Sequence, residues 1–380
     1  MTRARQLLDA AKAQTGLCNF GEESFREGLE HLVRAIDGEA RFNDIGKVAF
    51  DGQIVGHLSD RLQVEDWYAQ HPEIEEEQIV APLIGLGLPR TGSTALGCLL
   101  GEDPAARTLR TWETMRPCPP SGFAPESVAA RIVLAEASME RRARLFPRMV
   151  QMLPSTATSP SECQTFMAMD FKSQMFQAFA HIPSYVDWLY HRADLVPTYA
   201  YVKRVLKLLQ WKGPPAKWRL KNPSHSLFIG ALDQVFPDAR YVMTHRTVAD
   251  VVPSVADLYF ELSSAYSDHA DKLYLGHHAA EFAELGMKRM IAFRDAGHDV
   301  RFFDIHFAPF QADPFPVLAA LYNWMGETLS DETVSRMKAW RTSTPRDKHG
   351  GHVYEAADFG LVPTQLRERF AFYQERFDVS

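Results

Sequence analysis

The sequence predicts an α/β fold with a central parallel β-sheet flanked by helices on both faces. The first observation is an apolar run at residues 78–89, QIVAPLIGLGLP, which ends in a Gly/Pro turn as a buried parallel strand does. The second is the recurrence of strand patterns at residues 217–222, 238–246 and 298–307, each separated from the next by a helical segment. The third is composition, since 46% hydrophobic and 23% charged residues are typical of a globular protein.

Two helical additions accompany the sheet. Residues 1–75 are charged and have helical periodicity, so they predict a helical N-terminal extension. Residues 76–380 then form the α/β domain, with a helical insertion at about 120–215 that is rich in Met, Phe, Tyr and Trp.

Charge, cysteine usage and apolar runs exclude several classes of protein. The chain has 41 Lys and Arg against 48 Asp and Glu, a net charge of −7, so we expect no nucleic-acid partner. No signal-peptide pattern or run of about 20 apolar residues is present, which predicts no transmembrane segment and a cytoplasmic location. Neither a C-x-x-C pair nor a metal-binding His spacing occurs, so we expect no metal site.

The turn after the first strand has the spacing of a phosphate-binding loop. Residues 87–94 read GLPRTGST, which fits G-x-x-x-x-G followed by a hydroxyl residue at Thr94. Ser93 stands where nucleoside triphosphatases have lysine, and the loop contains the cation Arg90 instead. Backbone amides at a helix N-terminus together with a cation predict an anion site, although a simple helix-capping turn is the alternative.

Three segments together resemble the sulfotransferases that use 3′-phosphoadenosine 5′-phosphosulfate (PAPS), particularly their bacterial branch. They are PRTGST at residues 89–94, WRLKNPSH at residues 218–225, and an Arg at the end of a strand followed eight residues later by Ser, here Arg246 and Ser254. The resemblance implies a P-loop-like sulfotransferase fold, PAPS as the sulfate donor and 3′,5′-adenosine bisphosphate as the product. The residues that it assigns to donor binding are Arg90, Thr91, Gly92, Ser93, Thr94, Arg246 and Ser254. A basic loop near the C-terminus adds Arg346 and Lys348 as donor-binding candidates, with solvated surface charge as the alternative.

The resemblance also implies the catalytic groups. Arg90 and Lys221 would supply positive charge to the leaving phosphate, and a general base would accept the proton of the acceptor hydroxyl. His225 is the first candidate for this base, because imidazole titrates near neutral pH. Glu113 is the competitor, since it follows Arg90 by 23 residues, as a carboxylate does in some branches of the family.

The Met and aromatic residues of the insertion suggest a hydrophobic small-molecule acceptor, such as an alcohol or a phenol. Residues at helical spacing are more often core than pocket, so both interpretations stay open. A P-loop small-molecule kinase and a non-catalytic nucleotide-binding module are the alternative functions, and self-association as a homo-oligomer is also open. The insertion residues concerned are Met149, Met152, Phe166, Met167, Met169, Phe171, Met175, Phe176, Phe179, Tyr185, Trp188 and Tyr190.

Overall fold

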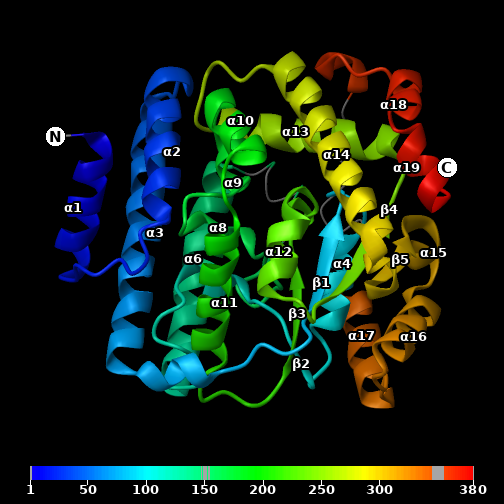
Figure 1. Cartoon of the computed structure of the whole chain (residues 1–380), viewed down its shortest axis with the longest axis horizontal. Helices are drawn as coiled ribbons and strands as arrows, with labels where there is room; N and C mark the ends of the chain where they lie inside the picture. Colours follow the sequence, from blue (N-terminus) through cyan, green and yellow to red (C-terminus); the bar gives the residue numbers. More distant parts are fainter. Residues whose placement is uncertain (1, 147, 149–151, 153–154, 345–354, 380) are drawn as a thin grey trace.

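The computed structural model describes residues 2–344 and 355–379, except residues 147, 149–151 and 153–154. Its centre is a five-stranded sheet in the order β2-β3-β1-β4-β5, and every neighbouring pair of strands is parallel (Figure 1). The predicted α/β class with a central parallel sheet is therefore confirmed. The strands are β1 (Leu83–Gly87), β2 (Ala106–Arg107), β3 (Lys217–Lys221), β4 (Arg240–His245) and β5 (Phe302–His306).

Helices surround the sheet and form most of the remaining chain. The α-helices before β3 are α1 (Arg3–Thr15), α2 (Phe25–Glu39), α3 (Asp44–Gln70), α4 (Ser93–Leu100), α5 (Thr111–Met115), α6 (Val128–Leu145), α8 (Gln164–Ala168), α9 (Met175–Phe179), α10 (Pro183–His191) and α11 (Val196–Gln210). Those after β3 are α12 (Ile229–Val235), α13 (Val248–Ser264), α14 (Lys272–Phe293), α15 (Phe307–Ala312), α16 (Pro314–Met325), α17 (Asp331–Ser343), α18 (Pro363–Arg369) and α19 (Ala371–Phe377). Short 3-10 or π turns are η1 (Pro72–Glu76), η2 (Pro125–Ser127), η3 (Pro223–Phe228), η4 (Arg294–His298), η5 (Asp299–Arg301) and η7 (Ala356–Phe359).

The sequence patterns predict four of these strands and miss β2. β2 contains two residues and pairs only with the start of β3, where Arg107 lies opposite Trp218. A two-residue strand has too few positions to show an alternation of polar and apolar side chains.

The register of the sheet brings the carboxyl ends of three strands to one edge. Gly85 of β1 lies opposite Lys221 of β3, and Gly87 of β1 lies opposite Thr244 of β4. In open α/β sheets, ligands bind outside these carboxyl ends. The loops that follow β1, β3 and β4 therefore face the same region of space.

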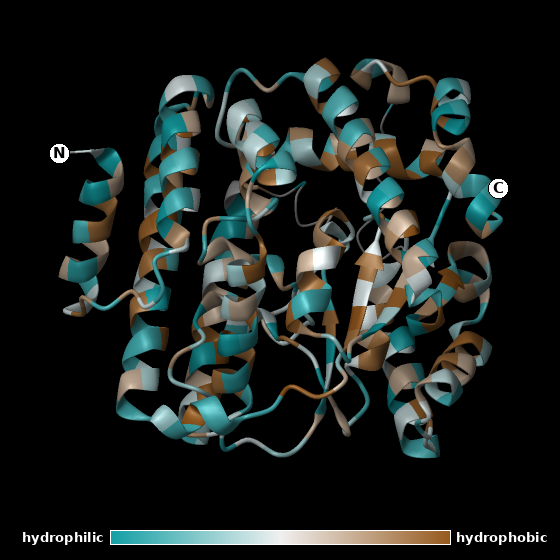
Figure 2. Cartoon of the chain, in the orientation of Figure 1, coloured by the Kyte–Doolittle hydropathy of each residue, from teal (hydrophilic) through white to brown (hydrophobic). Residues whose placement is uncertain are grey.

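Alternate strand residues contribute to two hydrophobic cores, one on each face of the sheet. Leu83 and Val242 pack with apolar residues of α4, α16 and α17. Ile84 and Tyr241 belong to the larger core, which includes α11, α13 and α14. In Figure 2, β1 is accordingly brown and near-white, without teal residues, whereas the N-terminal helices mix brown and teal residues.

A buried arginine joins the N-terminal helices to the insertion. Arg61 of α3 is fully buried and donates from Nε to the carbonyl oxygen of Phe20, at 2.7 Å. Its Nη1 lies 3.4 Å from a carboxylate oxygen of Asp170, and its guanidinium lies over the rings of Phe25 and Tyr201. The larger core is continuous across this contact, because it contains apolar residues of α1, α2 and α3 as well as of α8–α11.

Candidate functional site

The loop between β1 and α4 has an unusual backbone. Gly87 has φ +116° and Gly92, the N-cap of α4, has φ +90°. A side chain at Gly92 would also be tight, because a Cβ atom there would lie 3.2 Å from the ring of Phe307. Arg90 adopts φ +65°, a conformation that costs energy for a residue with a side chain and that is found most often at functional sites.

The hydroxyl groups of this loop have different surroundings. Thr91 is buried, and its Oγ1 donates to the carbonyl oxygen of Leu88 at 2.7 Å and lies 2.5 Å from Oγ1 of Thr244. The Thr91 side chain therefore holds the loop against β4. Ser93 is half-buried and Thr94 is exposed at the start of α4. The amide groups of this first helical turn have no partner within the helix and favour an anion.

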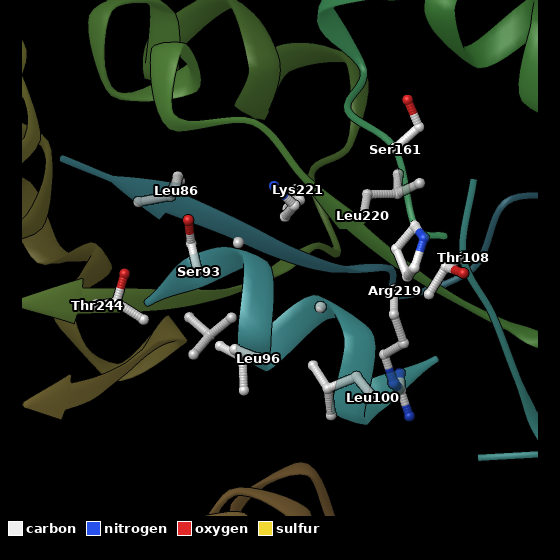
Figure 3. Close-up of a pocket in the computed structure, with 14 residues that line it drawn as sticks. Leu86, Ser93, Leu96, Leu100, Thr108, Ser161, Arg219, Leu220, Lys221 and Thr244 are labelled. Atoms are coloured by element: carbon white, nitrogen blue, oxygen red, sulfur yellow. The ribbon is translucent and has the colours of Figure 1, made fainter. Parts of the chain in front are cut away.

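Lys221 supplies an ammonium group beside the first turn of α4. Its Nζ lies 3.5 Å from Oγ1 of Thr94 and 2.6 Å from Oε1 of Glu162, and its side chain is only 9% exposed. The stem of Lys221 packs over Gly97, where a Cβ atom would lie 3.3 Å from Cδ of the lysine. Figure 3 shows Lys221 beside α4, near Ser93. A lysine on β3 thus provides the cation that the loop itself lacks at position 93.

Glu162 is a site residue that the sequence patterns did not reveal. Its segment precedes α8, and the amide N–H of Cys163 donates to the carbonyl oxygen of Lys221 at 3.2 Å, which fixes the segment against β3. Its second carboxylate oxygen accepts from Nε2 of Gln164 at 2.6 Å, and the side chain is 25% exposed. Glu162 and Lys221 are 59 residues apart in the sequence, and no local motif connects them.

Arg246, Ser254 and Arg90 come together beside the same loop. Arg246 follows β4 and donates from Nη1 to the carbonyl oxygen of Arg90 at 3.2 Å, while its Nε and Nη2 contact Asp250 at 3.3 and 3.2 Å. Nε of Arg90 donates to Oγ of Ser254 at 3.2 Å, and Nη1 donates to the carbonyl oxygen of Met152 at 3.1 Å. Arg90 therefore links the other two residues, since its carbonyl oxygen bonds to Arg246 and its guanidinium bonds to Ser254.

Glu113 lies in α5, and its carboxylate is bound by two arginines. Its Oε1 accepts from Arg107 at 2.7 Å, and its Oε2 accepts from the backbone N–H of Arg110 at 3.1 Å. Arg107 lies opposite Trp218 in the sheet, three residues before Lys221. None of the contacts described for Glu113 joins its carboxylate to the loop or to Lys221.

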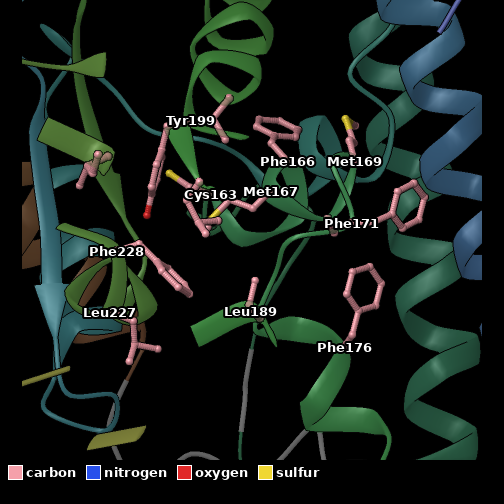
Figure 4. Packing of buried hydrophobic residues seen from close by; sticks show 14 of the residues in the cluster. Cys163, Phe166, Met167, Met169, Phe171, Phe176, Leu189, Tyr199, Leu227 and Phe228 are labelled. Carbon is pink, nitrogen blue, oxygen red and sulfur yellow. The ribbon is translucent and has the colours of Figure 1, made fainter. Parts of the chain in front are cut away.

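His225 lies in the interior of the protein, within η3. It is 1% exposed, and its Nδ1 is 2.9 Å from the hydroxyl of Tyr199 on α11. Burial disfavours the charged imidazolium and lowers the pKa of His225 to about 3. Tyr199 points into a cluster with Cys163 and Phe228 (Figure 4). The ring of His225 therefore faces the core, and the described contacts do not bring it to the loop.

The aromatic and Met residues of the insertion are mostly core, which favours the second of the two interpretations given above. Met149 lies outside the described residues, Met152 packs in a small cluster with Ala178, Leu258 and Leu262, and Met175 and Phe179 are partly buried. The remaining residues are buried in the larger core: Phe166, Met167, Met169, Phe171, Phe176, Tyr185, Trp188 and Tyr190. Figure 4 labels Phe166, Met167, Met169, Phe171 and Phe176 among them.

A small cavity lies between α4 and the sheet. Its volume is about 20 Å³, and its lining includes Lys221, Thr108 and Arg219 (Figure 3). Oγ1 of Thr108 and Nε of Arg219 are buried and have no hydrogen-bond partner within the described part of the chain. A space of this size with polar atoms on its walls suits about one water molecule.

Three further expectations concern the basic C-terminal loop, a metal site and a transmembrane segment. Arg346 and Lys348 lie outside the described residues. Among the residues that the structure describes, no cluster of His, Cys, Asp or Glu has the arrangement of a metal site. Within the same residues, no helix has both the length and the apolar character needed to cross a membrane.

Known proteins resemble the chain along its whole length. A model of the sulfotransferase family matches residues 82–331. The crystal structure of sulfotransferase STF9 from Mycobacterium avium has 30% identity and a TM-score of 0.88, with coverage of 100% of this chain and 98% of that one. Sulfotransferase STF1 from Mycobacterium tuberculosis H37Rv has 32% identity and a TM-score of 0.87, with coverage of 98% and 99%. No curated protein sequence matches the chain.

Proposed function

This chain belongs to the sulfotransferase family, and we propose from that premise that it transfers a sulfuryl group from PAPS to a hydroxyl group of a small-molecule acceptor. The observation that supports this most strongly is the convergence of three anion-binding elements at the carboxyl ends of β1, β3 and β4. They are the first turn of α4, the Lys221 ammonium, and the group formed by Arg90, Arg246 and Ser254.

These elements form two groups of donors, and a donor molecule with two separate anionic ends would use both. The amides of Ser93 and Thr94 and the ammonium of Lys221 would bind the 5′-phosphosulfate. The guanidinium of Arg246 and the hydroxyl of Ser254 would bind the 3′-phosphate. Arg90 extends toward Ser254, so we assign it to the 3′-phosphate side rather than to the bridging oxygen.

The chemical step exchanges one S–O bond for another. The acceptor oxygen forms a bond to sulfur, the bond between sulfur and the 5′-phosphate oxygen breaks, and the acceptor proton passes to a base. The products are the sulfate ester and 3′,5′-adenosine bisphosphate, and Lys221 would stabilise the charge that develops on the departing phosphate. In this proposal the cations of the chain neutralise that charge and no metal ion takes part.

Glu162 is the base that the geometry favours. Its carboxylate is partly exposed beside Lys221, so it lies next to the group that would hold the reacting phosphosulfate. His225 is enclosed and bonded to Tyr199, and Glu113 is paired with Arg107. We therefore propose that Glu162 accepts the acceptor proton and that His225 helps to position the end of β3.

A partly buried apolar residue of the insertion near the loop favours an acceptor with a hydrophobic portion. Met175 is partly buried, and its neighbour Gln174 lines a small cavity together with Gly87, Leu88 and Pro89 of the loop. A hydroxyl compound with an apolar skeleton, such as a lipid-like alcohol or a phenol, would suit these surroundings. We propose this acceptor class on that basis.

Calorimetric titration with 3′,5′-adenosine bisphosphate, without added metal, tests the donor site. We expect binding by the wild type and a loss of at least about tenfold in Arg246→Ala, because a charge-assisted contact to phosphate is removed. Arg240→Ala is the matched control, since Arg240 lies at the opposite end of β4, where its Nη1 donates to the carbonyl oxygen of Trp324. Binding of Mg²⁺-ATP in place of the bisphosphate would contradict the proposal and favour a kinase.

A further inference from the structure

One side of α6 is apolar and faces solvent. Val133 is 67% exposed and Leu134 is 62% exposed, and Ala129 and Ala130, one turn earlier on the same side, are also exposed. Residues at i, i+1, i+4 and i+5 form a continuous stripe along a helix. Monomeric proteins rarely leave such a contiguous apolar stripe uncovered.

The opposite side of α6 already has its partners. Ile132, Ala135 and Met139 pack with Trp112 and Ala157. A surface helix normally has one apolar side and one polar side, and a helix that is apolar on both sides is usually covered on both. The outer stripe of α6 therefore needs a second partner.

Charged residues flank the stripe in a self-complementary pattern. Glu126 lies just before α6 and Arg141 lies in its last turns, and both are exposed. Neither forms an ion pair with another residue in the described part of the chain. The two are equidistant along the sequence from the bond between Val133 and Leu134. An antiparallel pair of α6 helices that crosses there would place each Glu126 beside the Arg141 of the other copy.

We propose that the outer face of α6 is the interface of a homodimer with twofold symmetry. Twofold symmetry requires a surface that is complementary to itself, and this stripe with its two oppositely charged ends satisfies that requirement. Ala130 and Ala137 are related by the same midpoint, and their small side chains would let the helices approach closely. This proposal is independent of the proposed catalytic function.

A second copy fits the surface better than an anionic membrane does. An anionic bilayer would attract Arg141 at one end of the stripe and repel Glu126 at the other. In the dimer, the same Glu126 has an arginine opposite it. A single helix pair buries a limited area, so we expect a dimer that dissociates on dilution.

Sedimentation velocity of the full chain over a range of protein concentrations measures the equilibrium. We expect Leu134→Glu to weaken dimerisation by at least about tenfold, because it places a charge in the apolar contact. Val300→Glu is the matched control, since Val300 is 83% exposed and lies outside α6. Circular dichroism checks that both variants keep the fold.

Charge reversal tests the antiparallel register itself. Glu126→Arg and Arg141→Glu should each weaken the dimer through like charges, and the double variant should restore it. A wild type that stays monomeric at all concentrations would overturn the proposal, as would a double variant without recovery. Sedimentation with phosphatidylserine vesicles tests the membrane alternative. If the wild type is a monomer that binds the vesicles, and Leu134→Glu abolishes this binding, the face is a membrane-binding surface and the dimer proposal is overturned.

Discussion

At the scale of single residues, the ion pair between Lys221 and Glu162 is the contact on which the proposed chemistry depends most. The ammonium would hold the leaving phosphate, and the carboxylate 2.6 Å away would take the proton. Removing the Lys221 charge should therefore affect donor binding and the departure of the phosphate, whereas removing the Glu162 charge should affect proton transfer. The Glu162 carboxylate also accepts from Gln164, which keeps it in place for this task.

Glu162→Gln should lower kcat by roughly 100-fold or more, because general-base catalysis contributes about 10²–10⁴-fold. The amide is close in size and leaves Lys221 free to bind the donor, so the affinity for 3′,5′-adenosine bisphosphate should change little. Steady-state kinetics with PAPS and a phenolic acceptor measure the first quantity, and calorimetry measures the second.

Glu113→Gln is the control for this prediction. It breaks the buried pair with Arg107, which is only 16% exposed, so it should lower the thermal midpoint and leave kcat within a few fold. The opposite pattern, with kcat lost in Glu113→Gln and retained in Glu162→Gln, would return Glu113 to the role of base.

The sequence predicts part of this site for clear physical reasons. The phosphate-binding loop, Lys221 and Arg246 each directly follow or end a buried strand, and parallel strands bring such positions to one edge. Glu162 is beyond the reach of that reasoning, because its partner is 59 residues away and its segment has no regular structure of its own. His225 shows the converse, since a histidine near a strand end can turn into the core, and only the packing of Tyr199 decides this.

At the scale of elements, the contact between the N-terminal helices and the insertion depends on buried charge. Asp170 is fully buried and accepts hydrogen bonds from Ser24 at 2.8 Å and Thr198 at 2.7 Å, in addition to its contacts with Arg61 and Lys172. Ser24 at the start of α2, Arg61 of α3 and Thr198 of α11 each contribute a donor, so the carboxylate, which follows α8 in the chain, ties these helices together. Such a network stabilises the fold only while it is complete.

Arg61→Met should reduce the free energy of unfolding by about 3–5 kcal/mol, because it leaves part of a buried ion pair without its partner. Urea denaturation followed by tryptophan fluorescence measures the change. Arg5→Met, at an exposed position on α1, should alter it by no more than about 0.5 kcal/mol. If the two variants unfold at the same urea concentration, the Arg61 network does not stabilise the helical contact.

In two regions of the chain, the insertion and α6, the periodicity of apolar residues does not predict which side chains are buried. The Met and aromatic spacing of the insertion is more often that of a core than of a pocket and fits both, and burial decides for the core at Phe166, Phe171 and Phe176. α6 has apolar residues on two sides, and Val133 and Leu134 on one of them face solvent. Sequence periodicity identifies the faces of a helix and does not tell which of them the rest of the chain covers.

At the scale of the whole molecule, buried histidines make the stability of the fold depend on pH. Burial lowers the pKa of His57 to about 4, of His225 to about 3 and of His278 to about 4. In the unfolded chain these groups take up a proton near pH 6.5. As pH falls below 6.5 the unfolded state binds protons that the folded state does not, so stability is lost down to about pH 4.

His57→Leu should therefore gain stability relative to the wild type as pH falls from 6.5 to 4, by up to about 3 kcal/mol. His57 packs against Phe171 and Phe176, and its Nε2 has no hydrogen-bond partner among the described residues. A leucine at this position therefore keeps the apolar contacts and gives up no hydrogen bond of Nε2. Asp60, with a pKa raised to about 7 by burial, acts in the opposite direction in both proteins and cancels in the comparison. Urea midpoints at a series of pH values measure the difference, and a constant gap would refute the prediction.

The hydrophobic core shared by the N-terminal helices and the insertion also limits how genes of this family can be recombined. The family match begins at residue 82, which suggests that the helices before it could be exchanged as a cassette between relatives. Arg61, Phe25 and Tyr201 lie on both sides of that boundary and contact one another in the interior. At about 30% identity between relatives, the side chains that replace Arg61 and Phe25 are not expected to pack against Tyr201 after an exchange. A chimera would need both halves of this contact from the same parent.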